Sequence, residues 1–213
     1  MRVIAIDGPA GAGKSTIARA VAAHLGLAYL DTGAMYRAVT LAALQRGIDP
    51  ADRPAVAALA RQLAIDVSEL VTIDGTDATD AIRGPAVTAA VSTVAAHPEV
   101  RAELVRRQRE WADDHGGGVV EGRDIGTVVL PAAEVKVFLT ASGPARARRR
   151  AGERAGGDPA VVQDHLARRD ALDSSRADSP LAVAPGAVVI DTSELSIEEV
   201  VGAVLACLPR RRP

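Results

Sequence analysis

An octapeptide near the start of the chain, GPAGAGKS at Gly8–Ser15, is the feature that most constrains what this sequence can fold into. It satisfies the pattern G-x-x-x-x-G-K-[ST] in full. It follows an apolar, β-branched run at Val3–Ile6 and leads into a helix-period stretch that continues to Leu25. A strand, a glycine-rich turn and a helix in this order predict a loop whose backbone N–H groups curl around an anion.

The residue types in this loop suit a nucleoside triphosphate and Mg²⁺. The glycines let N–H groups point inward, and Lys14 adds a full positive charge near the β and γ phosphates, while the hydroxyl of Ser15 is a suitable Mg²⁺ ligand. A glycine-rich turn that matches by chance is the alternative, and the flanking strand and helix count against it. The predicted ATP-binding residues are Gly8, Pro9, Ala10, Gly11, Ala12, Gly13, Lys14, Ser15 and Thr16.

Composition disfavours several other classes of protein. The chain has 213 residues, 48% of them apolar, which is enough for one core, so we expect a single domain over residues 1–213. Cys207 is the sole cysteine, so neither an intramolecular disulfide nor a cysteine metal cluster is encoded. A net charge of −2 and 2% aromatic residues disfavour nucleic-acid binding.

The first apolar run breaks at Asp7, unlike a signal peptide or a membrane span. We therefore expect a cytoplasmic protein without a membrane partner, and a monomer is our default.

Apolar runs of strand length alternate with helix-period stretches, which predicts an α/β fold with a parallel sheet covered on both faces. Strands are expected at Val3–Ile6, Ala28–Leu30, Val119–Glu121, Val135–Leu139 and Val188–Ile190. Helices are expected at Ser15–Leu25, Ala34–Arg46, Arg53–Leu63, Pro85–Ala96, Pro98–Asp114, Pro144–Arg154, Val161–Ser174 and Ser196–Leu208.

Two stretches interrupt this alternation. Ile65–Gly84 combines β-branched residues with turn formers and predicts a small strand-rich insert. Gly152–Pro159 is polar and glycine-rich and lies between two arginine-bearing helices, where an ordinary surface loop and a hinged lid are both compatible with the sequence. The arginines at Arg210–Arg212 predict a solvated tail.

Polar residues follow two of the predicted strands in the sequence. Thr32 and Arg37 lie about one turn apart at the start of a helix, with Thr32 as its expected cap, and a helix start favours an anion. Arg123 and Asp124 follow Val119–Glu121, at the edge where doubly wound sheets bind ligands. A capped helix with a surface arginine, and a surface Arg–Asp pair, are the respective alternatives.

Two further runs, RARRR and RRDALDSSR, each place three charged side chains on one face of a predicted helix. The spacing is i, i+3 and i+4 in the first run and i, i+4 and i+7 in the second. Solvated helix faces are the alternative. Preorganised cations are needed to neutralise a transferring phosphoryl group, however, and both runs flank the glycine-rich segment, so we expect a functional arginine in each. In order, the residues are Arg146, Arg149 and Arg150, then Arg169, Asp173 and Arg176.

The loop alone does not identify a reaction, because regulatory GTPases, ATPases and small-molecule kinases all carry it. A guanine-specific switch normally needs an N/T-K-x-D element. Lys14 and Lys136 are the lysines of the chain, and Lys136 lies inside the predicted strand VKVFL. The sequence therefore disfavours a regulatory GTPase.

The sequence resembles the bacterial cytidylate kinases, a branch of the P-loop nucleoside monophosphate kinases, over nearly the whole chain. The matching segments, in family order, are IDGPAGAGKST, LDTGAMYRA, AVSTVAAHPEVRAELVRRQR, EGRDIGTVVLP, VKVFLTAS, RARRR and RRDALDSSRADSPL. The segments EGRDIGTVV and DSSRADSPL are the more specific ones. The resemblance implies a P-loop NTPase fold with a five-stranded parallel core, an acceptor-binding insert at residues 62–96 and a lid at residues 148–160.

The resemblance also implies the reaction ATP + CMP (or dCMP) → ADP + CDP (or dCDP) with Mg²⁺, and a role for each site residue. Lys14, Arg146, Arg149 and Arg150 would be catalytic. In the acceptor site, Arg37, Arg123 and Arg176 would hold the phosphate, Arg169 and Asp173 would approach the sugar, Ser92, Arg101 and Asp124 would read cytosine, and Thr32 and Tyr36 would complete the set.

Cytosine has an N4 amine donor beside its N3 and O2 acceptors, which a carboxylate, a guanidinium and a hydroxyl complement. Uracil reverses the first two groups and would leave Asp124 facing a carbonyl oxygen, so we expect CMP to be strongly preferred over UMP. On the residues alone, Ser92 could bond its own helix backbone, and Arg101 could pair with Glu99 or Glu103.

Two rival functions stay open at this point. The nearest is a P-loop kinase for another acceptor, such as UMP, AMP or a metabolite. The other is a regulatory module that binds ATP or nucleic acid through its arginine runs, and its low aromatic content counts against nucleic acid.

Overall fold

The computed structural model describes residues 1–153, 159–176 and 179–209 and consists of two compact units. Unit 1 contains Met1–Tyr29 and the chain from His115 onward, and unit 2 is Leu30–Asp114. The expected lid at 148–160 includes residues 154–158, which lie outside the described residues, as do the tail arginines Arg210–Arg212. Among the described residues, no helix has both the length and the apolar character needed to cross a bilayer.

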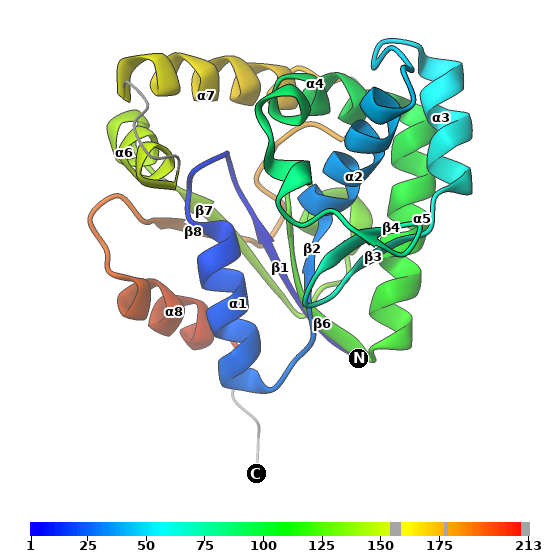
Figure 1. The fold of residues 1–213 in the computed structure, drawn as a ribbon. Helices are drawn as coiled ribbons and strands as arrows, with labels where there is room; N and C mark the ends of the chain where they lie inside the picture. The colour runs from blue at the N-terminus through cyan, green and yellow to red at the C-terminus, as the bar shows by residue number, and fades with distance from the viewer. Residues whose placement is uncertain (154–158, 177–178, 210–213) are drawn as a thin grey trace. The chain divides into compact units, whose positions relative to one another are not determined.

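A five-stranded parallel sheet with the order β2-β6-β1-β7-β8 is the framework of unit 1 (Figure 1). The edge strand β2 contains the boundary between the two units. The strands are β1 (Arg2–Asp7), β2 (Tyr29–Asp31), β6 (Gly117–Gly122), β7 (Val135–Thr140) and β8 (Val188–Asp191). All five strands predicted from the sequence are thereby confirmed.

The register of the two central strands determines which residues meet at the carboxyl edge. Asp7, the last residue of β1, lies opposite Gly122, the last residue of β6. The next residues, Gly8 and Arg123, therefore leave the sheet side by side. In parallel sheets this edge is where ligands bind.

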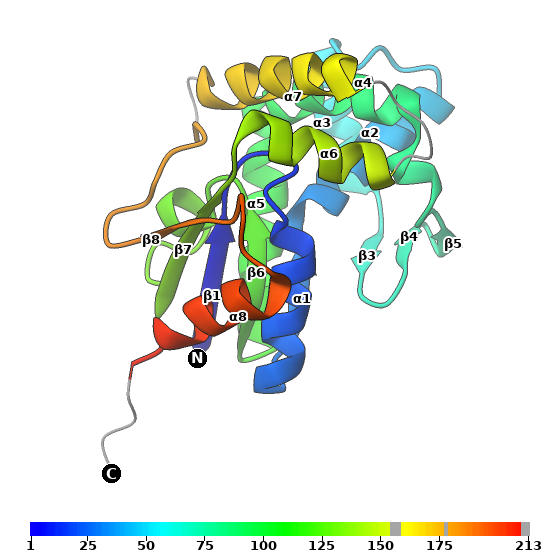
Figure 2. The same cartoon turned by 90° about the vertical axis from the view of Figure 1, so that its left-hand side faces the viewer.

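The core of unit 1 follows from two apolar patterns. β1 is continuously buried from Val3 onward, as expected for a central strand covered on both faces. The helices α1 (Lys14–Leu25) and α8 (Ile197–Ala206) each present one apolar face to the same core (Figure 2). Val21 of α1 and Val204 of α8 are examples of these buried residues. Each fully buried side chain of this size contributes about 1.5–3 kcal/mol.

Three further elements of unit 1 lie near the candidate site residues. A π-helical turn, η2 (Ile125–Val129), directly follows β6. The helices α6 (Gly143–Glu153) and α7 (Pro159–Ser174) pack against each other and carry the two arginine runs (Figures 1 and 2).

Unit 2 combines four helices with a small antiparallel sheet. The helices are α2 (Thr32–Gln45), α3 (Arg53–Gln62), α4 (Pro85–Ala95) and α5 (Pro98–Asp114). The sheet has the order β3-β4-β5, with strands β3 (Ile65–Val67), β4 (Val71–Ile73) and β5 (Thr76–Asp77), and a 3-10 turn, η1 (Ala81–Arg83), follows. The strand-rich character expected for Ile65–Gly84 is confirmed, while an acceptor-binding role for residues 62–96 stays a prediction.

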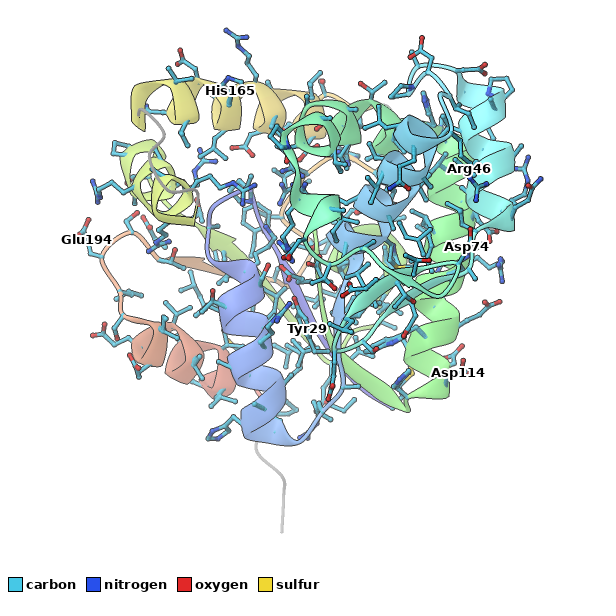
Figure 3. The ribbon with its side chains drawn as sticks, viewed as in Figure 1. Tyr29, Arg46, Asp74, Asp114, His165 and Glu194 are labelled. Carbon is cyan, nitrogen blue, oxygen red and sulfur yellow. The ribbon has the colours of Figure 1, made fainter. Side chains whose placement is uncertain are left out.

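The turn between β4 and β5 is formed by Asp74 and Gly75, both at positive φ, as a tight hairpin requires. Arg46, at the end of α2, donates to Asp74 over 2.9 Å (Figure 3). This ion pair ties the small sheet to α2.

The cap of α2 differs from the expectation. The carboxylate of Asp31 accepts the N–H of Ala34 at 3.0 Å, so Asp31 is the N-cap and Thr32 is the first helical residue. The prediction of Thr32 as the cap was wrong, because aspartate at the preceding position caps at least as well as threonine.

Candidate active site

The glycine-rich loop at Gly8–Ser15 connects β1 to α1 and packs against β7 and α6. A Cβ atom on Gly8, at φ 147, would lie 2.0 Å from the carbonyl oxygen of Leu139 in β7. A Cβ atom on Gly11 would lie 3.1 Å from the Cβ of Arg146 in α6. Close approach therefore requires glycine at Gly8, and a φ of 76 together with the tight contact favours glycine at Gly11.

Lys14 is buried, and its ammonium group donates to the carbonyl oxygen of Pro9 over 2.9 Å, so the side chain spans the loop. Burial lowers the pKa of Lys14, and the positive charge of Arg123 acts in the same direction, against the carboxylate of Glu121. A polyphosphate at this site would offset both effects and stabilise the charged ammonium.

The start of α1 presents the remaining loop residues. Gly13 is the N-cap in the left-handed conformation, and Lys14 is the first helical residue. Ser15 is half-buried in the first turn, and Thr16 is exposed. The hydroxyl of Ser15 therefore lies at the positive end of the helix, next to the lysine.

Asp7 holds the turn that follows β6. Its two carboxylate oxygens accept the N–H groups of Ile125 and Gly126, each at 2.8 Å. Burial raises the pKa of Asp7 to about 6, the charge of Asp124 acts in the same direction, and the two amide bonds and Lys14 oppose them. A buried carboxylate therefore fixes the backbone directly after Arg123 and Asp124.

Asp173 joins two of the predicted arginines. Arg123 donates its Nε–H to Asp173 over 2.8 Å and an Nη1–H to the carbonyl oxygen of Gly8 over 2.6 Å. Arg176 donates to the other oxygen of Asp173. Burial raises the pKa of Asp173, but the charges of Arg123, Arg176 and Arg169 outweigh it and hold that pKa below its ordinary value.

These contacts exclude an exposed ion pair between Arg123 and Asp124. The side chain of Arg123 is 14% exposed and that of Asp173 is 1% exposed. Asp124 is itself buried. Both residues are therefore largely shielded from water, and their role in binding a ligand stays a prediction.

Arg146 connects α6 to the loop. Its Nη1 donates to the carbonyl oxygen of Ala10 over 3.2 Å and also to Asp170 on α7. The other carboxylate oxygen of Asp170 accepts the N–H of Ala10 at 3.2 Å. One carboxylate thus links an arginine and the loop backbone.

Arg149 reaches the same loop through a threonine. It donates to the hydroxyl of Thr192 over 2.9 Å, and that hydroxyl lies 3.2 Å from the carbonyl oxygen of Ala12. Arg150 is half-buried on the same helix, and Arg148 is exposed. Arg146 therefore contacts the loop directly, and Arg149 contacts Thr192, which supports the loop.

Asp7, Asp170 and Thr192 were missed by the sequence analysis. Thr192 follows the carboxyl end of β8, and Asp7 ends β1, so their position at the ligand-binding edge was a usable signal. Asp170 lies three residues before Asp173 and shares its helix face, which was the corresponding signal on α7.

Unit 2 holds the other predicted acceptor residues. Arg37 is buried and donates from Nη1 to the carbonyl oxygen of Ile82 and to the hydroxyl of Thr88, each over 3.1 Å. Thr32 is buried at the start of α2. An exposed arginine beside a capped helix is thereby excluded.

Arg101 is buried, with its guanidinium carbon 5.6 Å from the centre of the Tyr36 ring, which is cation–π geometry. Glu99, one of the partners considered for Arg101, pairs with Arg53. Ser92 is half-buried on α4. The structure thus brings Tyr36 and Arg101 together in unit 2, and Arg123, Asp173 and Arg176 together in unit 1.

Solved kinases share this architecture. A gluconokinase from Sinorhizobium meliloti 1021 matches with a TM-score of 0.52 at 15% identity, over 96% of this chain and 90% of that chain. A sugar kinase from Janibacter sp. HTCC2649 matches with a TM-score of 0.52 at 18% identity, over 97% and 94%. With the glycine-rich loop at the end of β1, these likenesses show that the chain has the same P-loop fold as these proteins.

Sequence comparison is more specific. The model of the family described as cytidylate kinase matches residues 4–210. A cytidylate kinase from Geobacillus kaustophilus is 53% identical over 98% of this chain and 96% of its own length, and one from Mycobacterium avium is 52% identical over 93% and 91%. The chain belongs to the cytidylate kinase family.

Proposed function

We propose that this protein transfers the γ-phosphoryl group of ATP to CMP or dCMP and so forms ADP and CDP or dCDP. The observation that carries the proposal is the position of Arg123. Arg123 and Arg176 both donate to the buried Asp173. Arg123 also donates to the carbonyl oxygen of Gly8, the first residue of the glycine-rich loop at Gly8–Ser15, called the ATP loop from here on. An arginine suited to an acceptor phosphate thus contacts the loop suited to the donor.

The donor side is assigned to Gly8–Thr16 and α6. The loop N–H groups and the start of α1 would bind the β and γ phosphates, with the ammonium of Lys14 beside them. Arg146 and Arg149, already held at the loop, would neutralise the charge that spreads over the transferring group, and Arg150 is assigned to the same face.

Mg²⁺ would be held by the Ser15 hydroxyl together with phosphate oxygens of ATP. A hydroxyl in the first turn of α1, next to Lys14, is a hard oxygen donor and fits this ion, which takes few protein ligands and keeps several waters. When bound, Mg²⁺ would neutralise negative charge on the phosphates of ATP.

The acceptor side is assigned residue by residue. Arg37, Arg123 and Arg176 are proposed to bind the phosphate of CMP, and Arg169 and Asp173 to contact the sugar. Ser92 and Arg101 are assigned to the base and Asp124 to its N4 amine, with Thr32 and Tyr36 beside them.

The burial of Asp124 and Arg101 supports the base assignment, since polar groups shielded from water discriminate strongly between matched and mismatched partners.

The reaction needs no covalent enzyme intermediate. An oxygen of the acceptor phosphate is already ionised, so it can attack the γ-phosphorus directly while the bond from that phosphorus to the β,γ-bridging oxygen breaks. The protein's part is to align the two phosphates and to neutralise charge with Lys14 and the arginines. A cytoplasmic location and a monomeric state stay predictions.

An acceptor panel tests the proposal. ADP formation from Mg²⁺-ATP is measured with CMP, dCMP, UMP, AMP and no acceptor. CMP or dCMP should stimulate ADP formation strongly and UMP only weakly. Turnover of UMP at a comparable rate would contradict the assignment of Asp124, and ADP release that no acceptor stimulates would contradict the kinase itself.

A further inference from the structure

Asp170 on α7 is bound on both of its oxygens at the ATP loop. Oδ1 accepts the N–H of Ala10 at 3.2 Å, and Oδ2 accepts from Nη1 of Arg146. The same Nη1 also donates to the carbonyl oxygen of Ala10 over 3.2 Å. Asp170, Arg146 and Ala10 therefore form a closed triangle of hydrogen bonds that joins α7, α6 and the loop.

From this geometry we infer that Asp170 is a positioning residue for phosphoryl transfer, which acts by holding Arg146 in place over the ATP loop. The inference rests on the proposed function and adds a residue to it. Asp170 itself need not touch either substrate, because its two oxygens are taken up by the arginine and the loop.

The state of Arg146 supports this role. Nη1 makes the bonds described above, whereas its Nε is buried and has no hydrogen-bond partner among the residues that the structure describes. A buried N–H of a cation without a partner is costly, and a phosphate oxygen would satisfy it. The triangle thus fixes one edge of the guanidinium and leaves another edge for a ligand.

Preorganisation explains why a carboxylate is needed beside a loop that binds a triphosphate. A negative charge there weakens anion binding by itself. Arginine, however, has a long stem with many rotamers, and a charge-assisted bond to a partly buried carboxylate holds it in one of them before ATP arrives. The side chains of Arg146 and Asp170 are 14% and 18% exposed, so water competes little for this bond.

The residues around Asp170 allow a second role to be tested against this one. In this second role, Asp170 acts solely by holding the loop through the N–H of Ala10. That role does not involve Arg146, so its loss would lower kcat by the same factor whether or not the arginine is present. A double-mutant cycle separates the two roles.

The test uses Asp170→Asn, which keeps the shape and an acceptor for Ala10 but removes the charge that holds Arg146. We expect kcat to fall about tenfold, with the KM for CMP changed by less than about twofold. Asp164→Asn, which removes one charge from an exposed position on the same helix, should behave as the wild-type protein. In an Arg146→Ala background, Asp170→Asn should lower kcat by less than about twofold further.

Three results would overturn the inference. They are an unchanged kcat in Asp170→Asn, an equal loss of kcat with and without Arg146, and a rise in ATP affinity or kcat, which would make Asp170 a competitor of the triphosphate. Thermal melts accompany the kinetics. If Asp170→Asn does not fold, the cycle is run with Asp170→Glu and Arg146→Lys.

A wild-type protein that does not phosphorylate CMP would refute the proposed function, whereas an active wild type with an unaffected Asp170→Asn would refute only this inference.

Discussion

Replacing Asp7 by asparagine should change how the stability of the protein depends on pH. Asp7 is buried at the end of β1, and burial raises its pKa from an ordinary value of 3.8 to about 6. Between these two values the folded protein holds a proton on Asp7 that the unfolded chain has lost. Stability contributed by this proton is therefore present below pH 3.8 and is lost as the pH rises to about 6.

The size of the effect follows from the same two values. An interval from 3.8 to about 6, at about 1.36 kcal/mol per tenfold change in proton affinity, amounts to about 3 kcal/mol. In Asp7→Asn this proton is absent at every pH. Because the unfolded carboxyl is already partly deprotonated at pH 4, the free energy of unfolding of the wild-type protein minus that of the variant should fall by about 2 kcal/mol of this total between pH 4 and pH 7.

Urea unfolding of both proteins at intervals between pH 4 and pH 7 measures this difference. Val119→Ala, a packing change in β6 that removes no titratable group, is the control, and its difference from the wild type should not depend on pH. A difference for Asp7→Asn that stays constant, or that grows with pH, would refute the reasoning, because it would mean that the carboxylate is stabilised and not penalised by its burial.

Three further predictions concern the site. Lys14→Ala should lower kcat about a hundredfold or more while the circular dichroism spectrum is retained, and near-normal turnover would exclude the assigned role. Burial lowers the pKa of Lys14 and a triphosphate should raise it again, so ATP binding should take up protons at pH 8. Calorimetry in buffers of different ionisation enthalpy measures this uptake, and a binding heat that is the same in all buffers would contradict it. Asp124→Asn should raise the ratio of UMP to CMP turnover, since an amide can donate to the uracil oxygen, and a fall in both rates with an unchanged ratio would remove Asp124 from base selection.

Local patterns were sufficient to predict the elements of this fold. The buried run of β1, the helical spacing of apolar residues in α1 and the turn formers between β3, β4 and β5 each express a preference over a few residues. The ATP loop was predicted for the same reason, because its glycines, lysine and serine are consecutive. Where two local preferences competed, as with Asp31 and Thr32 for the cap of α2, the prediction failed.

The contacts that organise the site could not be predicted in this way. Asp170 meets Ala10 across 160 positions of sequence, and Asp7 meets Ile125 across 118. These partners are determined by strand order and helix packing, which a single sequence does not specify residue by residue. The resemblance to a known family supplied roles for Arg123 and Asp173, but only the structure showed that each is held by a partner.

The central claim is that the arginines around Asp173 and the loop at Gly8–Ser15 act on one pair of adjoining phosphates. A molecule in which adenosine and cytidine are joined through a polyphosphate chain tests it most directly, by its binding stoichiometry and by competition with each substrate. We predict one molecule bound per chain, competition with both ATP and CMP, and an affinity well above that of either substrate alone. Competition with ATP only, at an affinity no better than that of ATP, would contradict the claim.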